Sequence, residues 1–160
     1  MTAVVILALV TLQRLAELAL SWRNTKRLLS RGAREVAPGH YPLLVLLHAG
    51  WLASLWLLVP GRPFQIMPLI LFGLLQLARV WVIATLGDRW TTRIIVLPGA
   101  PLVRSGPYRW VDHPNYLIVI GEIALLPLAF GLPVVAIVFS LLNGLLLWVR
   151  IGSENRALRP

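Results

Sequence analysis

The chain has 160 residues with a formal charge of +9, of which 58% are hydrophobic and only 13% are charged, and its mean hydropathy is +0.79. These values, with apolar runs near 20 residues long, exclude an ordinary soluble domain and predict an integral membrane protein. The chain contains no cysteine, which excludes disulfides and thiolate metal sites, and we expect no bound metal.

Five apolar runs, taken in chain order, predict an all-α fold of five transmembrane helices. Their expected ranges are 2–22, 41–59, 65–86, 115–130 and 134–150. The last two helices are short, and the tight Gly131-Leu132-Pro133 turn between them predicts a helical hairpin. The first run contains Arg14 and Glu17 and lacks a basic start, so we expect a retained helix and no cleaved signal peptide. We expect one membrane-embedded domain over residues 1–160.

The basic residues lie on one side of these predicted helices. They fill the first loop, the third loop and the C-terminal tail, whereas the opposite side holds only Arg62. By the positive-inside rule, both loops and the C-terminus are cytoplasmic, and the N-terminus faces out. The charge of +9 is therefore mainly topological, with a weaker role in attracting anionic membrane lipid, and we expect no nucleic-acid partner. Aromatic residues near the cytoplasmic helix ends, including Trp90 and Trp110, predict an interfacial belt.

Polar residues interrupt all five predicted spans at one depth, about seven residues or roughly 10 Å from the cytoplasmic ends. The layer consists of Arg14, His48, Arg79, Glu122 and Asn143. Gln13, Glu17 and Ser21 recur at intervals of four, which predicts a polar stripe facing the bundle interior. Two arginines against two glutamates predict internal ion pairs. These residues either stabilise helix contacts alone or line a chamber, and their shared depth favours the chamber.

The segment from Gly87 to Asp112 is long for a connector, which predicts a lid or a cofactor shelf in the cytoplasmic loop. Its proline and glycine turns leave backbone groups free to bond a ligand. Pro114 falls in the first turn of the fourth helix, and Asp112 or His113 is the expected cap. The free N–H groups and the positive dipole end there suit an anion.

Several motifs together resemble one family of membrane enzymes. The segments Gly106-Pro107-Tyr108 and His113-Pro114-Asn115-Tyr116, with Glu154-Asn155 after the final helix, resemble the isoprenylcysteine carboxyl methyltransferase family. A small bacterial branch of that family, associated with O-methylation of alkylpyrones and phenolic lipids, is similar to further segments: Arg14-Leu15-Ala16-Glu17-Leu18, Ser21-Trp22-Arg23-Asn24, Gly32-Ala33-Arg34-Glu35, His40-Tyr41-Pro42 and Trp90-Thr91-Thr92-Arg93-Ile94. The resemblance therefore spans nearly the whole chain.

The chain departs from this family pattern at two positions. Asp112 stands where the family usually has an arginine or lysine before its His-Pro pair, which weakens the case for a cationic carboxylate clamp there. Asn155 stands where many relatives have a second glutamate, which leaves one acidic contact instead of two.

The resemblance implies S-adenosylmethionine as the methyl donor, held at the cytoplasmic edge of the bacterial inner membrane. His113, Pro114 and the start of the fourth helix would hold its carboxylate, Glu154 and Asn155 would accept its ammonium, and Tyr116 would lie beside the sulfonium. The expected frame of the adenosine is Leu102, Val103, Gly106 and Tyr108.

The acceptor implied by the resemblance is lipophilic: an alkylpyrone, a phenolic lipid or a prenylcysteine-type carboxylate, with its tail entering sideways from the lipid. Methyl transfer depends on alignment and dehydration, so a strong base is needed only for an acceptor that is not already ionised. His48 is the first candidate base and Glu122 the second. Arg79 or Arg93 would hold the oxyanion, and Arg14 with Glu17 would shape the pocket floor.

Two other functions compete with methylation. An NADPH-dependent membrane reductase of the sterol-reductase type shares the His-Pro-x-Tyr element and would use the basic loops, although no basic set is obviously dedicated to a 2′-phosphate. A non-catalytic scaffold or small transporter would use the polar layer as a permeation path, which leaves the long loop and its motif without a purpose.

Overall fold

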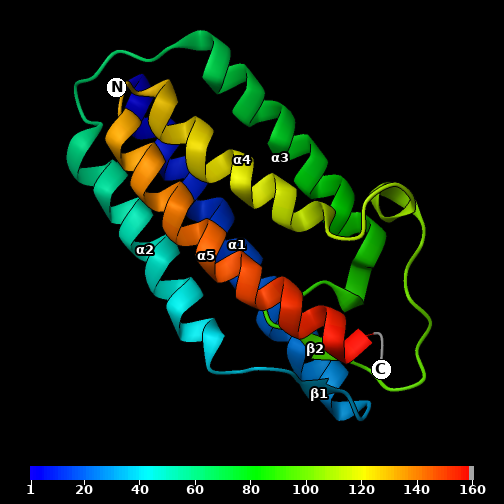
Figure 1. The fold of residues 1–160 in the computed structure, drawn as a ribbon. Helices are drawn as coiled ribbons and strands as arrows, with labels where there is room; N and C mark the ends of the chain where they lie inside the picture. Colours follow the sequence, from blue (N-terminus) through cyan, green and yellow to red (C-terminus); the bar gives the residue numbers. More distant parts are fainter. Residues whose placement is uncertain (159–160) are drawn as a thin grey trace.

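The structure, a computed structural model, describes residues 1–158 and is built almost entirely from helices (Figure 1). Its elements in chain order are α1 (Thr2–Ser30), β1 (Arg34–Glu35), α2 (His40–Leu58), α3 (Ile66–Leu86), the 3-10 turn η1 (Gly87–Arg89), β2 (Ile95–Val96), the 3-10 turn η2 (Gly106–Arg109), α4 (Pro114–Ala129) and α5 (Pro133–Leu158). The start of α1 and the end of α5 lie at opposite ends of the bundle. The prediction of an all-α membrane protein is therefore confirmed.

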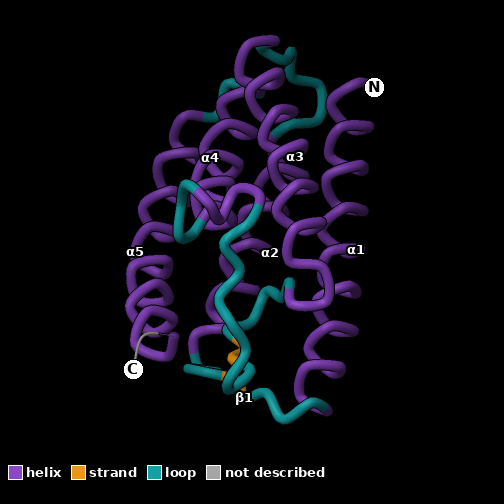
Figure 2. Tube along the Cα trace, turned by 90° about the vertical axis from the view of Figure 1, so that its right-hand side faces the viewer, coloured by secondary structure: helices purple, strands orange, loops and turns teal. Residues whose placement is uncertain are grey.

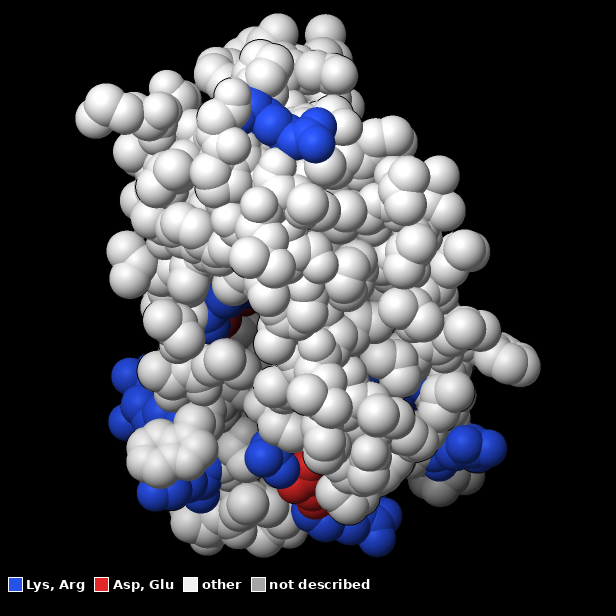
Figure 3. All heavy atoms as spheres, turned by 90° about the vertical axis from the view of Figure 1, so that its left-hand side faces the viewer, with Lys and Arg blue, Asp and Glu red and all other residues white. Residues whose placement is uncertain are grey.

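Four of the described helices, α1, α2, α3 and α5, are long and apolar enough to cross a membrane. The fourth helix, α4, has 16 residues, which rise only about 24 Å, against roughly 30 Å of hydrocarbon. Large apolar side chains such as Leu57 and Val134 are exposed on the outside of the bundle, where lipid would cover them. Figure 3 shows a lateral face that is almost free of charge, with the basic side chains gathered near one end.

Two predicted helix ends were wrong, because α1 runs to Ser30 and not to 22, and α5 runs to Leu158 and not to 150. Hydropathy marks the depth at which lipid ends, whereas the helical hydrogen bonds continue past that depth into water. The first helix stops only where Gly32 takes a positive φ of 86° and the N–H of Ala33 bonds back to the Leu28 carbonyl. Both helices therefore extend about two turns beyond the end of their apolar runs.

The core of the bundle lies toward the end that carries the N-terminus. Trp51, Leu55, Ile123 and Phe130 are fully buried there, and the Trp51 indole donates to the Ile123 carbonyl at 3.2 Å. A second, smaller cluster of Val82, Trp90 and Ile118 lies nearer the other end. The prediction of Trp90 as an interfacial anchor was wrong: its side chain is only 1% exposed, because the loop around it packs against the helices.

Part of the long connector between α3 and α4, which was predicted to form a lid or a cofactor shelf, is a short strand. Glu35 pairs with Ile95 in a two-residue antiparallel ladder that ties the α1–α2 link to the α3–α4 connector. After β2 the chain runs back toward the middle of the bundle, where α4 begins. The helices α1 and α5 continue past that level (Figures 1 and 2). The recessed start of α4 positions the candidate site.

Gly106 begins η2 where a side chain does not fit. Its φ is +53°, and an added Cβ would collide with the side chain of Thr85 on α3. We expect Gly106→Ala to lower the free energy of unfolding by about 1–3 kcal/mol, from backbone strain together with the collision. Thermal unfolding in detergent measures this effect. Gly32→Ala is the matched control, because Gly32 has a φ of +86° but open space around it; equal losses in the two variants would contradict the steric part.

Candidate active site

A cavity of about 1240 Å³ joins the long α3–α4 loop to the interior of the bundle. At the loop end its walls include His113, Tyr116 and Glu154, and among the helices they include Arg14 and His48. Figure 3 shows charged side chains at the bottom of a hollow in the apolar lateral face. The polar groups at both depths therefore belong to one continuous space.

The motif at the start of α4 meets the last turns of α5 at the loop end of this cavity. The Tyr116 hydroxyl donates to Glu154 Oε2 at 2.7 Å, and His113 Nδ1 lies 3.6 Å from the same oxygen. His113 Nε2 lies 3.1 Å from Asn155 Oδ1, and the His113 ring stacks on Tyr116 with centroids 5.4 Å apart. We call these four residues the edge cluster.

The edge cluster corrects two details of the sequence analysis. Glu154 and Asn155 lie inside α5 and not after it. Their side chains reach the start of α4 because α5 is longer than its apolar run. His113 occupies the N-cap position of α4, but its side chain makes no capping bond there; it points to α5 instead. The His113 carbonyl, and not its side chain, accepts from the N–H groups of Tyr116 and Leu117 at the start of α4.

Tyr108 lines the same end of the cavity from η2. Burial, followed by the charge of nearby Glu154, raises the pKa of its hydroxyl above the usual value of 10.0. The hydroxyl is thus protonated near neutral pH and available as a donor. Leu102 and Val103 line the cavity beside it, whereas Gly106 and Pro114 do not.

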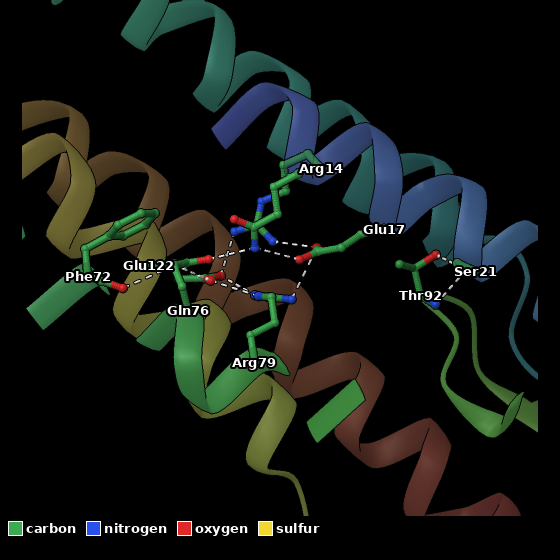
Figure 4. A network of polar contacts seen from close by, with 9 residues as sticks. Arg14, Glu17, Ser21, Phe72, Gln76, Arg79, Thr92 and Glu122 are labelled. Atoms are coloured by element: carbon green, nitrogen blue, oxygen red, sulfur yellow. Dashed lines mark hydrogen bonds and ion pairs between the residues drawn. The ribbon is translucent and has the colours of Figure 1, made fainter. Parts of the chain in front are cut away.

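The charged residues inside the bundle form a closed network of ion pairs (Figure 4). Glu122 accepts bonds from Arg14 at 2.8 Å, from Gln76 at 2.9 Å and from two nitrogens of Arg79. Glu17 accepts from Arg14 at 2.8 Å and lies 3.5 Å from Arg79. The predicted ion pairs are confirmed, and two positive charges balance two negative ones.

The hydrogen-bonded network includes only some of the residues of the predicted five-helix polar layer. The network joins α1, α3 and α4, and Gln13 of α1 also donates to Gln76 of α3 at 2.7 Å. His48 of α2 bonds within its own helix, to the Leu44 carbonyl. Asn143 of α5 is buried, and neither polar atom of its amide has a hydrogen-bond partner. Helical periodicity gave the depth of these residues but not which of them face one another.

His48 has a defined hydrogen-bonding pattern. Its Nδ1 lies 2.9 Å from the Leu44 carbonyl oxygen, which can only accept. In the neutral ring Nδ1 therefore carries the proton, and Nε2 is left as an acceptor. Because His48 lines the cavity among the helices, it offers a lone pair to a polar group bound there.

Thr92 connects the loop to three helices, α1, α2 and α5. Its N–H donates to Ser21 of α1 at 2.9 Å, and its hydroxyl lies 3.4 Å from that of Tyr41 on α2. Its carbonyl accepts from Arg150 of α5 at 2.9 Å. The neighbouring Arg93 bonds both Glu35 oxygens at 2.9 Å, so the predicted oxyanion ligand is already engaged at the rim.

The predicted site residues fall into two groups. Those that line the cavity are Arg14, Glu17, His48, Arg79, Arg93, Leu102, Val103, Tyr108, His113, Tyr116, Glu154 and Asn155. Glu122, Gly106 and Pro114 do not line it, and they support residues that do. Sequence reasoning missed Arg150, which also lines the cavity, because the positive-inside pattern already accounted for it. Its spacing of four from Glu154 on one helix was the signal that placed it on the same face.

Comparisons with known proteins agree with this geometry. The profile described as the isoprenylcysteine carboxyl methyltransferase (ICMT) family matches residues 67–160. The uncharacterized protein YpbQ of Bacillus subtilis is 38% identical over 161 residues, which cover 96% of this chain and 95% of that protein. An uncharacterized protein of Haemophilus influenzae is 29% identical over 153 residues, with 91% and 88% covered. No solved structure matches the chain significantly.

Proposed function

This chain belongs to the isoprenylcysteine carboxyl methyltransferase family, whose members are membrane enzymes that use S-adenosylmethionine, and from that membership we propose that it is an S-adenosylmethionine-dependent O-methyltransferase. Its acceptor is lipophilic: an alkylpyrone, a phenolic lipid or a prenylcysteine-type carboxylate. The reaction takes place at the cytoplasmic membrane face, where the loop meets the bundle.

The observation that carries this proposal is the single cavity shared by the edge cluster and the interior of the bundle. Its volume of about 1240 Å³ exceeds the roughly 300–1,000 Å³ typical of a site for one small ligand. It has a polar end beside the loop and walls that include Leu44, Val45 and Leu52 among the helices. A polar donor and a fatty acceptor therefore have room to meet.

The residues at the loop end fit the donor. Glu154 offers a carboxylate to an ammonium, because its two contacts in the edge cluster both fall on Oε2. The positive dipole end of α4 and the His113 ring suit a carboxylate. Asn115, the next residue but one after His113, has a buried Oδ1 without a hydrogen-bond partner and lines the cavity. Such a buried acceptor calls for a polar ligand.

The residues among the helices fit the acceptor. When bound, S-adenosylmethionine supplies an electrophilic methyl group. The neutral ion-pair network holds Arg14 and Glu17 rigidly at the cavity wall, and the apolar helices exclude water. His48 Nε2 accepts the proton of a hydroxyl acceptor, a role that an already ionised acceptor does not need.

The proposal includes a membrane topology. We infer five spans in the bacterial inner membrane: the four long helices and the shorter α4. The N-terminus lies outside and the C-terminus in the cytoplasm. The gathering of basic side chains at the loop end supports this orientation. The whole chain acts as one domain in this proposal, since residues of α1, α2 and α5 line a single cavity.

Two measurements test the proposed function. Calorimetry on the purified protein in detergent should detect binding of S-adenosylhomocysteine and none of NADPH. Incubation with methyl-labelled S-adenosylmethionine and bacterial lipid extracts should then transfer label to a lipid, identified by mass spectrometry. Binding of NADPH alone would favour the reductase, and binding of neither compound would favour the scaffold or transporter.

A further inference from the structure

Arg150 is a buried cation without a carboxylate partner. Its side chain is 4% exposed on α5 and lines the cavity. Its Nη2 donates to the Thr92 carbonyl, and its Nε is buried without a hydrogen-bond partner. A buried positive charge is unfavourable unless an anion compensates it. The structure thus leaves both a charge and a donor of Arg150 unmatched.

The charges of the other two arginines among the helices are balanced by carboxylates, although the Nε of Arg14, like that of Arg150, is buried without a hydrogen-bond partner. Arg14 and Arg79 share Glu17 and Glu122 within the ion-pair network. Within the described residues, no carboxylate lies within 4.0 Å of Arg150. Among these three arginines, Arg150 is the one without a carboxylate partner in the described residues.

Arg150 lines the cavity next to the edge cluster. It stands one helical turn before Glu154 on α5, and its guanidinium carbon is 6.0 Å from the centre of the Tyr116 ring. Its bond to the Thr92 carbonyl fixes it in this place. The acceptor oxygen has to reach this place, because the reacting atoms must lie next to the donor.

We propose that Arg150 binds the anionic oxygen of the acceptor, a carboxylate, enolate or phenolate. This inference rests on the proposed function and adds a specificity to it: the cavity selects lipophilic molecules with an ionised oxygen over neutral ones of the same length. The planar guanidinium presents several donors to such an oxygen, and the bound anion neutralises the buried charge.

A pair of simple lipids tests this selectivity. Dodecanoate and dodecanol have the same chain length but differ in charge at pH 8. We expect the wild-type protein in detergent to bind dodecanoate about tenfold or more tightly than dodecanol, measured by native mass spectrometry or calorimetry. Arg150→Gln should remove this preference. The matched control Arg156→Gln, an exposed position on the same helix, should keep it.

The donor provides the second measurement. S-adenosylhomocysteine affinity should be unchanged in Arg150→Gln, which would also demonstrate that the variant is folded. A preference for dodecanoate that survives in Arg150→Gln would overturn the proposal, and so would a tenfold loss of S-adenosylhomocysteine affinity, because Arg150 would then hold the donor. If Arg150→Gln does not fold, Arg150→Lys replaces it and should show a reduced preference, since lysine lacks the planar fork.

These outcomes separate the two proposals. A wild-type protein that does not bind S-adenosylhomocysteine would refute the proposed function, whereas the lipid pair tests Arg150 without any methyl transfer. Wild-type binding of both lipids with equal affinity would overturn the assignment of Arg150 even if methyl transfer is observed.

Discussion

Glu122→Ala is expected to lower the free energy of unfolding by about 3–5 kcal/mol. The Glu122 side chain is 2% exposed and bonds Arg14, Gln76 and Arg79. Its removal leaves buried Arg79 and half-buried Arg14 with Glu17 as their shared counter-ion, inside a bundle that lipid surrounds. A loss of this size is a large fraction of the free energy of unfolding of a typical domain, about 5–15 kcal/mol.

Unfolding in detergent, by heat or by titration with a denaturing detergent, measures the loss. The matched control is Glu35→Ala, which breaks the pair with Arg93 at the rim, where the two side chains are 20% and 38% exposed. We expect that control to lose less than about 1 kcal/mol, because a solvent-accessible ion pair contributes little. Similar losses in the two variants would show that the network does not stabilise the bundle.

Glu154→Ala is expected to weaken binding of S-adenosylhomocysteine by about 10-fold to 150-fold, the equivalent of roughly 1.5–3 kcal/mol for a hydrogen bond to a charged group. The physical reason is the loss of the carboxylate that accepts the donor's ammonium in the edge cluster. The side chain is 26% exposed, so the bundle should remain folded. Calorimetry gives the affinity, and thermal unfolding of the same sample checks the fold.

The control for this second variant is again Glu35→Ala, which removes an acidic side chain that does not line the cavity. It should bind S-adenosylhomocysteine as the wild type does. Unchanged affinity in Glu154→Ala would remove Glu154 from the donor site, and loss of affinity in both variants would indicate a long-range effect of charge and not a contact.

The sequence predicted the five helices because each is an apolar run of sufficient length, and it predicted the ion pairs because Arg14, Arg79 and Glu122 share one depth. Helix ends in water were not predictable in this way, since hydropathy no longer distinguishes helix from loop there. Glu154 and Asn155 were for that reason placed in a tail and not on α5.

Long-range pairing accounts for the remaining errors. The β1–β2 ladder joins residues that are about 60 positions apart and is only two residues long. A local sequence pattern therefore cannot predict this pairing. The burial of Trp90 follows from the same arrangement, because Asn24 of α1 holds the Trp90 carbonyl at 2.8 Å. Arg150 was read as a topology signal, and only its surroundings in three dimensions reveal a charge without a counter-ion.

The recessed start of α4 has a consequence for which reactant has to travel. Withdrawing a hydrocarbon tail from the bilayer forfeits roughly 0.8 kcal/mol for each methylene, or on the order of 12 kcal/mol for about fifteen carbons. In the proposed reaction the donor enters from the loop and the acceptor's head from the helices, because α4 begins part-way along the bundle and the cavity extends from the loop to Arg14 and His48. The lipophilic acceptor can then be methylated while its tail stays in the lipid leaflet, and the water-soluble donor diffuses to it.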